Sequence, residues 1–385
     1  MGGIKIMSQK DVTDMHGISN KVWYVARAIS GIPKDEDFRL EQEPVPEPGE
    51  GQVLMRTIYL GIAPGVRPML PYASAESDTD FNPSSGRADT SEDRLNDPTF
   101  IQVGDRMRSG YVGSPFFQTS GGVGQVIKSN HPGFKEGDYI LGARHWQEYE
   151  VVDGDVSLRL DPTEIPIEAY LSMTGLSSFA AWVGYRRLCD AKAGETLVVS
   201  SAAGTVSTLV IQLAKADGLR VIGISSGKGK CAFVTDRLVA NACIDRSAED
   251  IGKALDRLAP GGVDIYYDNV GGLMQKTVFD RLKPFARLIV CGLSAEYNGL
   301  ETSVIPSGMV LGKRLRVQGF VVLDYMKDYD AFYADIVNLR RAGKLVYDQQ
   351  IYQGIEQAPR ALHDCLSGNN QGGKIIVQVS ADTIK

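Results

Sequence analysis

Cysteine and histidine are scarce in this chain of 385 residues, and their positions exclude several kinds of site. The sequence has five cysteines, none before Cys189, and no C-x-x-C motif. An odd number without paired spacing argues against a disulfide framework or a structural zinc site. The four histidines are scattered, and none forms an H-x-x-x-H or H-E pair. We therefore expect no metal site.

An excess of positive charge and long apolar runs are also absent. The chain has 41 Lys and Arg against 47 Asp and Glu, a formal net charge of −6 at pH 7. This balance argues against nucleic acid or an anionic membrane as a partner. No apolar run approaches the length that spans a bilayer, and the first residues are too polar for a signal peptide. We expect a cytoplasmic protein whose length suits two domains.

The most informative segment that is present is a strand that turns directly into a helix. The apolar residues 197–199 are followed by small residues and then by a helical run at 209–216. Such a turn exposes backbone N–H groups at a helix N-terminus, which attract a phosphate. A dinucleotide fingerprint has three glycines, but only Gly204 is present here, with Ala202 and Ser207 in the other positions. An ordinary closely packed turn is the alternative reading.

The residues after the next predicted strand favour NADP over NAD. An NAD site places a carboxylate there for the ribose 2′-hydroxyl, whereas an NADP site supplies cations for the 2′-phosphate. Residues 225–230 read Ser-Ser-Gly-Lys-Gly-Lys, with Lys228 and Lys230 and no carboxylate. A pair of solvated lysines on a loop is the alternative, but the position favours a 2′-phosphate.

The order of predicted elements divides the chain into two kinds of architecture. Short strands between Pro and Gly residues, at 53–60, 116–127 and 139–142, predict a β-barrel-like domain. After residue 165, strands and helices alternate, which predicts a parallel doubly wound sheet. The strands are expected at 196–200, 221–225, 242–244, 265–269, 288–292 and 315–321, and the helices at 167–187, 205–217, 230–238, 248–258, 274–282 and 329–342.

The C-terminal segment is expected to complete the first domain, with a strand at 344–352, a helix at 359–367 and a strand at 374–379. The predicted organisation is a flexible leader (1–20), a first domain (21–164 and 344–385) and a dinucleotide-binding domain (165–343). Residues 75–97 contain seven acids and two arginines. We expect this segment to be a solvated loop or lid.

A series of short motifs runs along the chain between about residue 51 and residue 379. The motifs are residues 144–149 (RHWQEY), 173–177 (MTGLS), 199–206, 268–272 (DNVGG), Cys291-Gly292 through Tyr297-Asn298, Gly319-Phe320 and 368–372 (GNNQG). Each motif is weak alone, but their common order and spacing are specific. With them the chain resembles the zinc-independent medium-chain dehydrogenases/reductases, within them the prostaglandin reductase and alkenal double-bond reductase group.

The resemblance implies an α/β fold in which a Rossmann doubly wound parallel sheet is inserted in a GroES-like β-barrel catalytic domain. It implies NADPH-dependent reduction of the C=C bond of small hydrophobic α,β-unsaturated ketones or aldehydes. It also implies a homodimer joined through sheet edges near residues 315–321. Quinone reduction on the same fold and non-catalytic NADPH binding remain alternatives.

The resemblance also implies the site residues. The pyrophosphate would contact Gly204, Thr205, Val206 and Ser207, and Lys230 would contact the 2′-phosphate. The other expected NADP(H) contacts are Met173, Ser226, Lys228, Arg246, Asn269, Cys291, Phe320, Val321, Asn370 and Gly372. Tyr297 would lie beside the nicotinamide. As a phenol that is protonated at neutral pH, it is the expected catalytic donor to the substrate oxyanion.

Three positions depart from the family pattern. Ser207 replaces the last fingerprint glycine, and Arg246 replaces a tyrosine near the 2′-phosphate. A guanidinium makes charge-assisted contacts with phosphate, which favours NADP. Ala63 and Gly65 stand where the family has Asp and Tyr. Loss of that tyrosine predicts a wider or differently shaped substrate pocket.

Overall fold

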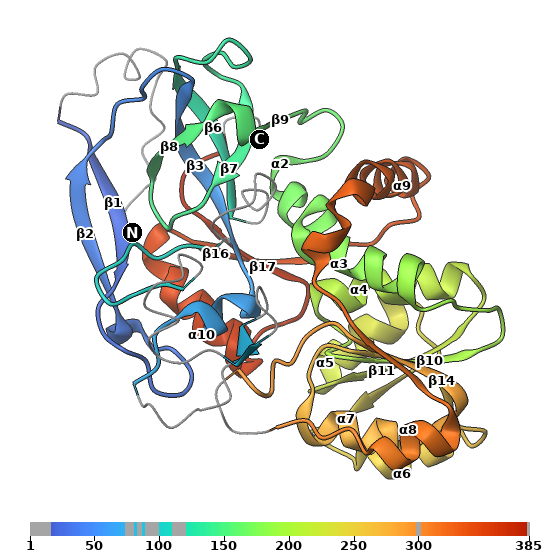
Figure 1. Cartoon of the computed structure of the whole chain (residues 1–385). Coiled ribbons are helices and arrows are strands. Elements are labelled where there is room, and N and C mark those ends of the chain that lie inside the picture. The colour runs from blue at the N-terminus through green and yellow to red at the C-terminus, as the bar shows by residue number, and fades with distance from the viewer. Residues whose placement is uncertain are drawn as a thin grey trace.

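The computed structural model describes residues 17–73, 81–82, 87–88, 100–109, 121–297 and 302–382. Two large sheets organise this part of the chain, a seven-stranded sheet and a six-stranded sheet. Figure 1 shows them in separate halves of the molecule, with the N-terminal strands in one half and the middle of the chain in the other.

The six-stranded sheet is parallel throughout, in the order β12-β11-β10-β13-β14-β15. The first strand in sequence, β10, lies inside the sheet, so the chain winds outward from it in both directions. This is the doubly wound arrangement expected from the alternation of strands and helices. The strands are β10 (Thr196–Ser200), β11 (Arg220–Ser225), β12 (Ala242–Asp245), β13 (Val263–Asp268), β14 (Leu282–Val290) and β15 (Arg316–Gly319).

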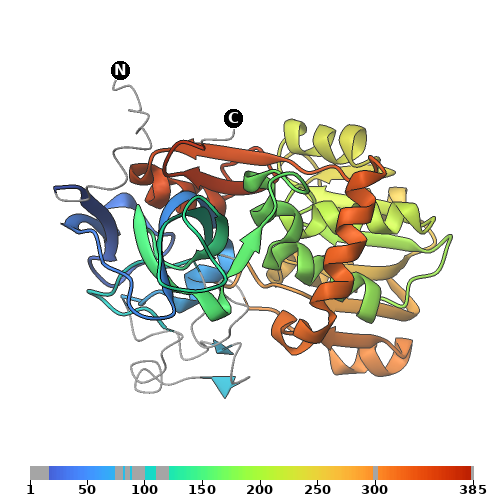
Figure 2. The same cartoon turned by 90° about the horizontal axis from the view of Figure 1, so that it is seen from above.

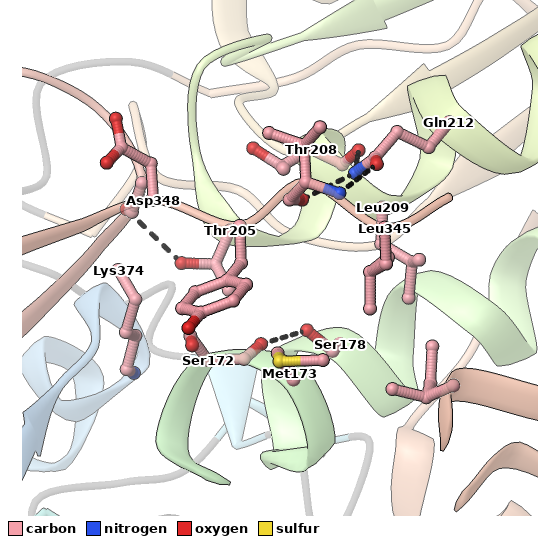
Figure 3. A pocket seen from close by; sticks show the side chains of 14 residues that line it. Ser172, Met173, Ser178, Thr205, Thr208, Leu209, Gln212, Leu345, Asp348 and Lys374 are labelled. Atoms are coloured by element: carbon pink, nitrogen blue, oxygen red, sulfur yellow. Dashed lines mark hydrogen bonds between the residues drawn. The ribbon is translucent and has the colours of Figure 1, made fainter. Parts of the chain in front are cut away.

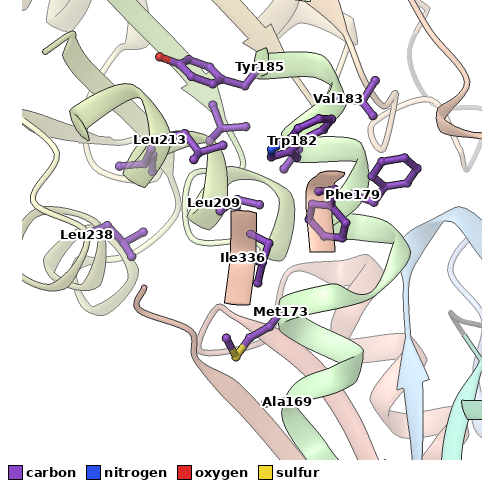
Figure 4. Close-up of a cluster of buried hydrophobic side chains, with 14 of the residues drawn as sticks. Ala169, Met173, Phe179, Trp182, Val183, Tyr185, Leu209, Leu213, Leu238 and Ile336 are labelled. Carbon is purple, nitrogen blue, oxygen red and sulfur yellow. The ribbon is translucent and has the colours of Figure 1, made fainter. Parts of the chain in front are cut away.

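Helices cover both faces of this sheet because successive side chains of a strand point to opposite faces. Leu197 and Val199 of β10 belong to one buried cluster, and Val198 belongs to another. The first cluster contains residues of α3 (Leu176–Val183), α4 (Thr205–Ala216) and α9 (Tyr329–Arg341); Figure 4 shows part of it. The second contains residues of α6 (Ile251–Leu258) and α7 (Gly272–Phe279), and partly buried residues of α8 (Ser307–Lys313) pack against it.

The seven-stranded sheet combines strands from residues 52–160 with strands from residues 349–378. Its order is β16-β17-β3-β6-β7-β9, and β8 also pairs with β3. Strand β17 runs antiparallel to β3, with Ile375 opposite Ile62. The parallel sheet is therefore inserted within a separate sheet domain, as expected. The strands are β3 (Gln52–Ile62), β6 (Gly122–Ser129), β7 (Tyr139–Ala143), β8 (Tyr149–Asp153), β9 (Leu158–Leu160), β16 (Gln349–Gln353) and β17 (Lys374–Gln378).

The remaining elements lie around this sheet. Strands β1 (Ser19–Val25) and β2 (Phe38–Pro44) form an antiparallel pair, so residues 19 and 20 belong to a strand and not to the predicted leader. Helix α10 (Ala358–Ser367) lies near the seven-stranded sheet in Figures 1 and 2. Most of the predicted lid at 75–97 lies outside the described residues; within it, β4 (Phe81–Asn82) pairs with β5 (Arg87–Ala88).

The predicted continuous helix at 167–187 is wrong. The segment contains α2 (Ile167–Ala169), a π-helical turn (Tyr170–Thr174), α3 and a second π-helical turn (Gly184–Leu188). The break falls at Gly175, which is extended, with φ −70° and ψ 168°. A Cβ there would lie 2.5 Å from the carbonyl oxygen of Leu171. The close approach of the backbone at residue 175 to that of Leu171 requires glycine. The helical periodicity of the sequence does not reveal this contact.

Other boundaries also differ from the prediction. The strand expected at 344–352 is confined to β16, and the strand expected at 315–321 ends at Gly319. Helix α8 and a 3-10 helix at Val322–Asp328 were not predicted; neither contains a fully buried residue.

Candidate active site at the carboxyl edge of the parallel sheet

Most of the predicted cofactor residues directly follow the carboxyl ends of the six parallel strands. Open α/β sheets bind ligands at this edge, because the ends of parallel strands share one side. The fold thus brings together residues from six separate segments. After β10 come Gly204, Thr205, Val206 and Ser207; after β11, Ser226, Lys228 and Lys230; after β12, Arg246; after β13, Asn269; after β14, Cys291; and after β15, Phe320 and Val321.

The turn between β10 and α4 has the open backbone that the sequence predicted. Gly204 precedes the first helical residue, and residues 204–206 are only partly buried. The first N–H groups of a helix have no partner within the helix, so this end offers donors to an anion. Gly204 also forms a bridge with Gly373, whose N–H donates to the Ala203 carbonyl over 2.7 Å. A C-terminal segment therefore closes one side of the turn.

Ser207, the departure from the glycine fingerprint, fits its position through its small size and its hydroxyl. The side chain is buried, and its Oγ donates to the carbonyl oxygen of Ser200 over 2.9 Å. The same Oγ accepts a hydrogen bond from Asn269 Nδ2 over 3.1 Å. Ser207 thus ties the helix to the ends of β10 and β13, and its hydroxyl is satisfied as both donor and acceptor.

Asp268 has a structural role. Its carboxylate is fully buried and accepts hydrogen bonds from Ser200 Oγ and Tyr266 Oη, each over 2.8 Å. The backbone N–H of Val270 and the side-chain amide of Gln275 donate to it over 2.9 and 3.0 Å. This network holds the loop after β13 in place.

Two cations, Lys230 and Arg246, interact electrostatically where the 2′-phosphate is expected. Lys230 is half-buried on α5 (Lys228–Ala232), and its Nζ donates to the Gly368 carbonyl over 2.8 Å. Burial lowers the pKa of Lys230, and the nearby Arg246 guanidinium lowers it further. Within the described ranges, no carboxylate forms an ion pair with either side chain. Two interacting cations that form no ion pair with an acid fit a site for a doubly charged phosphate.

The neighbouring carboxylate, Asp245, is already occupied by donors. It accepts the backbone N–H of Gly227 over 2.8 Å and the Ser247 hydroxyl over 2.5 Å. These hydrogen bonds hold the pKa of Asp245 below its usual value. Asp245 therefore shapes the loop before α5. Ser226 lies half-buried on that loop, and Lys228, at the start of the helix, is exposed.

Tyr297 follows β14 and is held by two hydrogen bonds. Its Oη accepts the backbone N–H of Leu293 over 3.3 Å, and its carbonyl accepts from Tyr72 Oη over 2.7 Å. Tyr72 belongs to the first domain, and the buried Arg67 guanidinium lies over its ring, 3.9 Å from the centroid. The motif partner Asn298 lies outside the described residues.

Tyr72 was not predicted as a site residue. The sequence contains only an indirect indication of its role. The tyrosine of the family is absent at Gly65, and another tyrosine occurs seven positions later. Only the fold shows that this side chain reaches the segment carrying Tyr297.

Cys291 has the properties of a small apolar residue. Burial raises the pKa of its thiol to about 12, so the sulfur is protonated at neutral pH and is a poor nucleophile. Its backbone N–H donates to the Asp268 carbonyl over 2.8 Å. Cys291 therefore contributes shape to the strand end.

The C-terminal loop brings two further predicted residues to the same edge. Asn370 Nδ2 donates to the Asp364 carbonyl over 3.0 Å, and Asn370 Oδ1 accepts from the Gly372 N–H over 3.1 Å. Gly372 has a φ of +98°, and an added Cβ would lie 3.0 Å from that of Ala203. Glycine is therefore required where this loop meets the β10–α4 turn.

Met173 is buried and lines a small cavity of about 20 Å³ between the two domains, together with Thr205 (Figure 3). Lys374 also lines it, and its Nζ donates to the Ile62 carbonyl over 3.0 Å. Burial lowers the pKa of Lys374 to about 8. The burial of Lys374 was not predicted, because a single Lys in a strand normally points to solvent.

The described residues contain no group of three or more His, Cys, Asp and Glu side chains that could hold a metal ion. No helix within these ranges is both long and apolar enough to cross a membrane.

Two family models of oxidoreductases match this chain. The family model described as zinc-binding dehydrogenase matches residues 205–338, and that of the N-terminal domain of oxidoreductase matches residues 21–83 and 87–160. The metal ligands that the first description implies are not found among the described residues.

Full-length relatives match over both domains. The chain is 33% identical to the NADPH-dependent curcumin reductase of Escherichia coli (strain K12), over 94% of this chain and 98% of the relative. It is 29% identical to a 2-alkenal reductase (NADP(+)-dependent) of Nicotiana tabacum, with the same coverage of each. The structure of CurA in complex with NADPH from Vibrio vulnificus superposes with a TM-score of 0.80, at 31% identity, over 94% of this chain and 100% of that chain. The chain therefore belongs to the medium-chain dehydrogenase/reductase family, in its group of NADP-dependent enone and alkenal reductases.

Proposed function

We propose that this protein uses NADPH to reduce the C=C bond of small hydrophobic α,β-unsaturated ketones and aldehydes. The observation that carries the proposal is the match along nearly the whole chain to the curcumin reductase and to the structure bound to NADPH. The cation pair and the open helix end at the sheet edge fit that cofactor.

The cofactor contacts are proposed from the placement of residues at the sheet edge. The N-terminal end of α4, with Gly204, Thr205, Val206 and Ser207, would hold the pyrophosphate, and Lys230 and Arg246 would hold the 2′-phosphate. The other residues would line the remainder of the dinucleotide: Met173, Ser226, Lys228, Asn269, Cys291, Phe320, Val321, Asn370 and Gly372.

NADPH, when bound, supplies the hydride for the β-carbon of the substrate. Negative charge then develops on the substrate carbonyl oxygen, which needs a hydrogen-bond donor. We propose that the Tyr297 hydroxyl is that donor, since an ordinary phenol, with a pKa near 10, is protonated at neutral pH. Tyr72 positions this segment by donating to the Tyr297 carbonyl.

The same proposal includes the domain limits, the oligomeric state and the cellular location. The domain limits are those expected from the sequence, 21–164 with 344–385 around 165–343, except that the first domain includes Ser19 and Asn20 of β1. A homodimer is supported by β15, a partly exposed strand at the end of the six-stranded sheet. A cytoplasmic location is supported by the five cysteines, which are all free thiols.

The test is an NADPH-oxidation screen over enones, enals, quinones and nitroalkenes, with product analysis. Saturated ketones or aldehydes from enones or enals are the expected products. Turnover of quinones alone would replace the proposal with quinone reduction. Tight NADPH binding without turnover of any acceptor class would indicate a non-catalytic binding protein.

A further inference from the structure

We propose that Cys231 and Cys243 form a redox pair that hydroperoxides oxidise to a disulfide, and that this disulfide weakens NADPH binding. The two Sγ atoms lie 2.9 Å apart, and both side chains are only partly buried. The effect on NADPH rests on the proposed role of Lys230, whereas formation of the disulfide does not.

The two sulfurs are already close to bonding distance. A disulfide has an S–S length of about 2.05 Å, so the sulfurs must approach by only about 1 Å. Cys243 lies in β12, which is hydrogen-bonded to β11. Cys231 lies on α5, which contains no buried residue. The surface helix is therefore the element that moves when the bond closes.

Movement of α5 affects the proposed 2′-phosphate site directly. Lys230 immediately precedes Cys231, and its Nζ is placed by the Gly368 carbonyl, 2.8 Å away. Arg246 lies three residues after Cys243, on the strand side of the pair. A bond between the sulfurs shifts one cation relative to the other, so the two no longer converge on one phosphate.

The oxidation balances with a hydroperoxide as the only co-reactant. The Cys231 thiol first loses its proton to solvent. The thiolate attacks the terminal oxygen of the hydroperoxide, the O–O bond breaks, and the alkoxide leaves as an alcohol after taking a proton. This gives a sulfenic acid on Cys231. The Cys243 sulfur then attacks the Cys231 sulfur, loses its proton, and displaces hydroxide, which leaves as water. The two thiols lose two electrons and the peroxide gains them.

Cys231 is the attacking thiol because Cys243 donates an S–H hydrogen bond to it. Burial raises the pKa of Cys231, the hydrogen bond from Cys243 lowers it, and Asp245 and Glu249 raise it; the net shift is upward. The pair is therefore a dithiol at neutral pH, and its oxidation is slow compared with that of a thiolate sensor. In a reducing compartment the disulfide would be transient.

The test exposes the full-length reduced protein to hydrogen peroxide or cumene hydroperoxide. Intact mass should show the loss of two hydrogen atoms, and peptide mapping should join Cys231 to Cys243. The affinity for NADPH should fall about tenfold, as for the loss of one charge-assisted contact, and a dithiol reductant should restore it.

Cys231→Ser and Cys243→Ser should each prevent both changes. Cys365→Ala is the matched control, because Cys365 lies close enough to Lys230 to interact with it electrostatically, and it should still form the disulfide. Failure of the wild type to form a Cys231–Cys243 disulfide would overturn the proposal. A disulfide that leaves NADPH affinity unchanged would overturn the coupling to the cofactor. The affinity of Lys230→Ala, measured separately, then shows whether the proposed phosphate site is itself wrong.

Discussion

The Tyr297 hydroxyl is the single group on which the proposed chemistry depends. Tyr297→Phe removes the donor and keeps the ring. Loss of one oxyanion donor costs about 10²–10³-fold in turnover, so kcat with the best enone should fall by that factor. NADPH affinity, measured by fluorescence titration, should be unchanged.

Tyr333→Phe is the matched control for this substitution. Tyr333 lies on α9, away from the carboxyl ends of the parallel strands, and its hydroxyl donates to Glu164 over 3.0 Å. The kcat of this variant should therefore be unchanged. Turnover of Tyr297→Phe at the wild-type rate would show that water or the ribose hydroxyl is the donor.

A single residue, Lys230, is also proposed to select NADPH over NADH. Lys230→Ala removes a charge-assisted contact worth about 1.5–3 kcal/mol, which corresponds to roughly tenfold or more in the NADPH dissociation constant. NADH, which has no 2′-phosphate, should bind the variant as it binds the wild type. Lys253→Ala, an exposed lysine of α6, is the control. Equal NADH and NADPH affinities in the wild type would refute the assignment.

At the scale of elements, the segment after β14 is held from the opposite domain by Tyr72. Tyr72→Phe removes the hydrogen bond to the Tyr297 carbonyl and keeps the ring under Arg67. Since Tyr72 acts through Tyr297, kcat should fall less than in Tyr297→Phe. In the double variant the two effects should not add. Additive losses in this double-mutant cycle would show that Tyr72 acts independently.

Edge strand β15 is the element proposed to join two copies. An unpaired strand edge favours pairing with a second copy, so light scattering should give a dimer at working concentration. Gln318→Lys adds a second cation next to Arg316 on the strand and should favour the monomer. A monomeric wild type would remove the dimer proposal.

For the whole molecule, we predict that activity needs no metal. The described residues hold no cluster of potential ligands, and the proposed donor is a phenol. NADPH oxidation should survive exhaustive chelation, and elemental analysis should find no stoichiometric zinc. Loss of activity on chelation, with recovery on adding zinc, would contradict this prediction.

Prediction from sequence succeeded where a local pattern matches a local structure. The strand at 196–200 was predicted with its observed bounds, because a short apolar strand followed by small residues has few alternative structures. The helix at 167–187 was wrong because its break depends on the approach of Gly175 to Leu171. The strand at 344–352 was too long because only residues from Gln349 onward pair with β17.

The sequence by itself determined the doubly wound sheet, its insertion in a second sheet domain and the cofactor class. Each of these depends on periodicity, on the order of elements or on residues adjacent in the chain. Tertiary structure alone brought Tyr72 to Tyr297, Lys374 to Ile62 and Cys231 to Cys243. These contacts join segments with no local pattern that relates them, so they exist only once packing has placed the strands, helices and loops together.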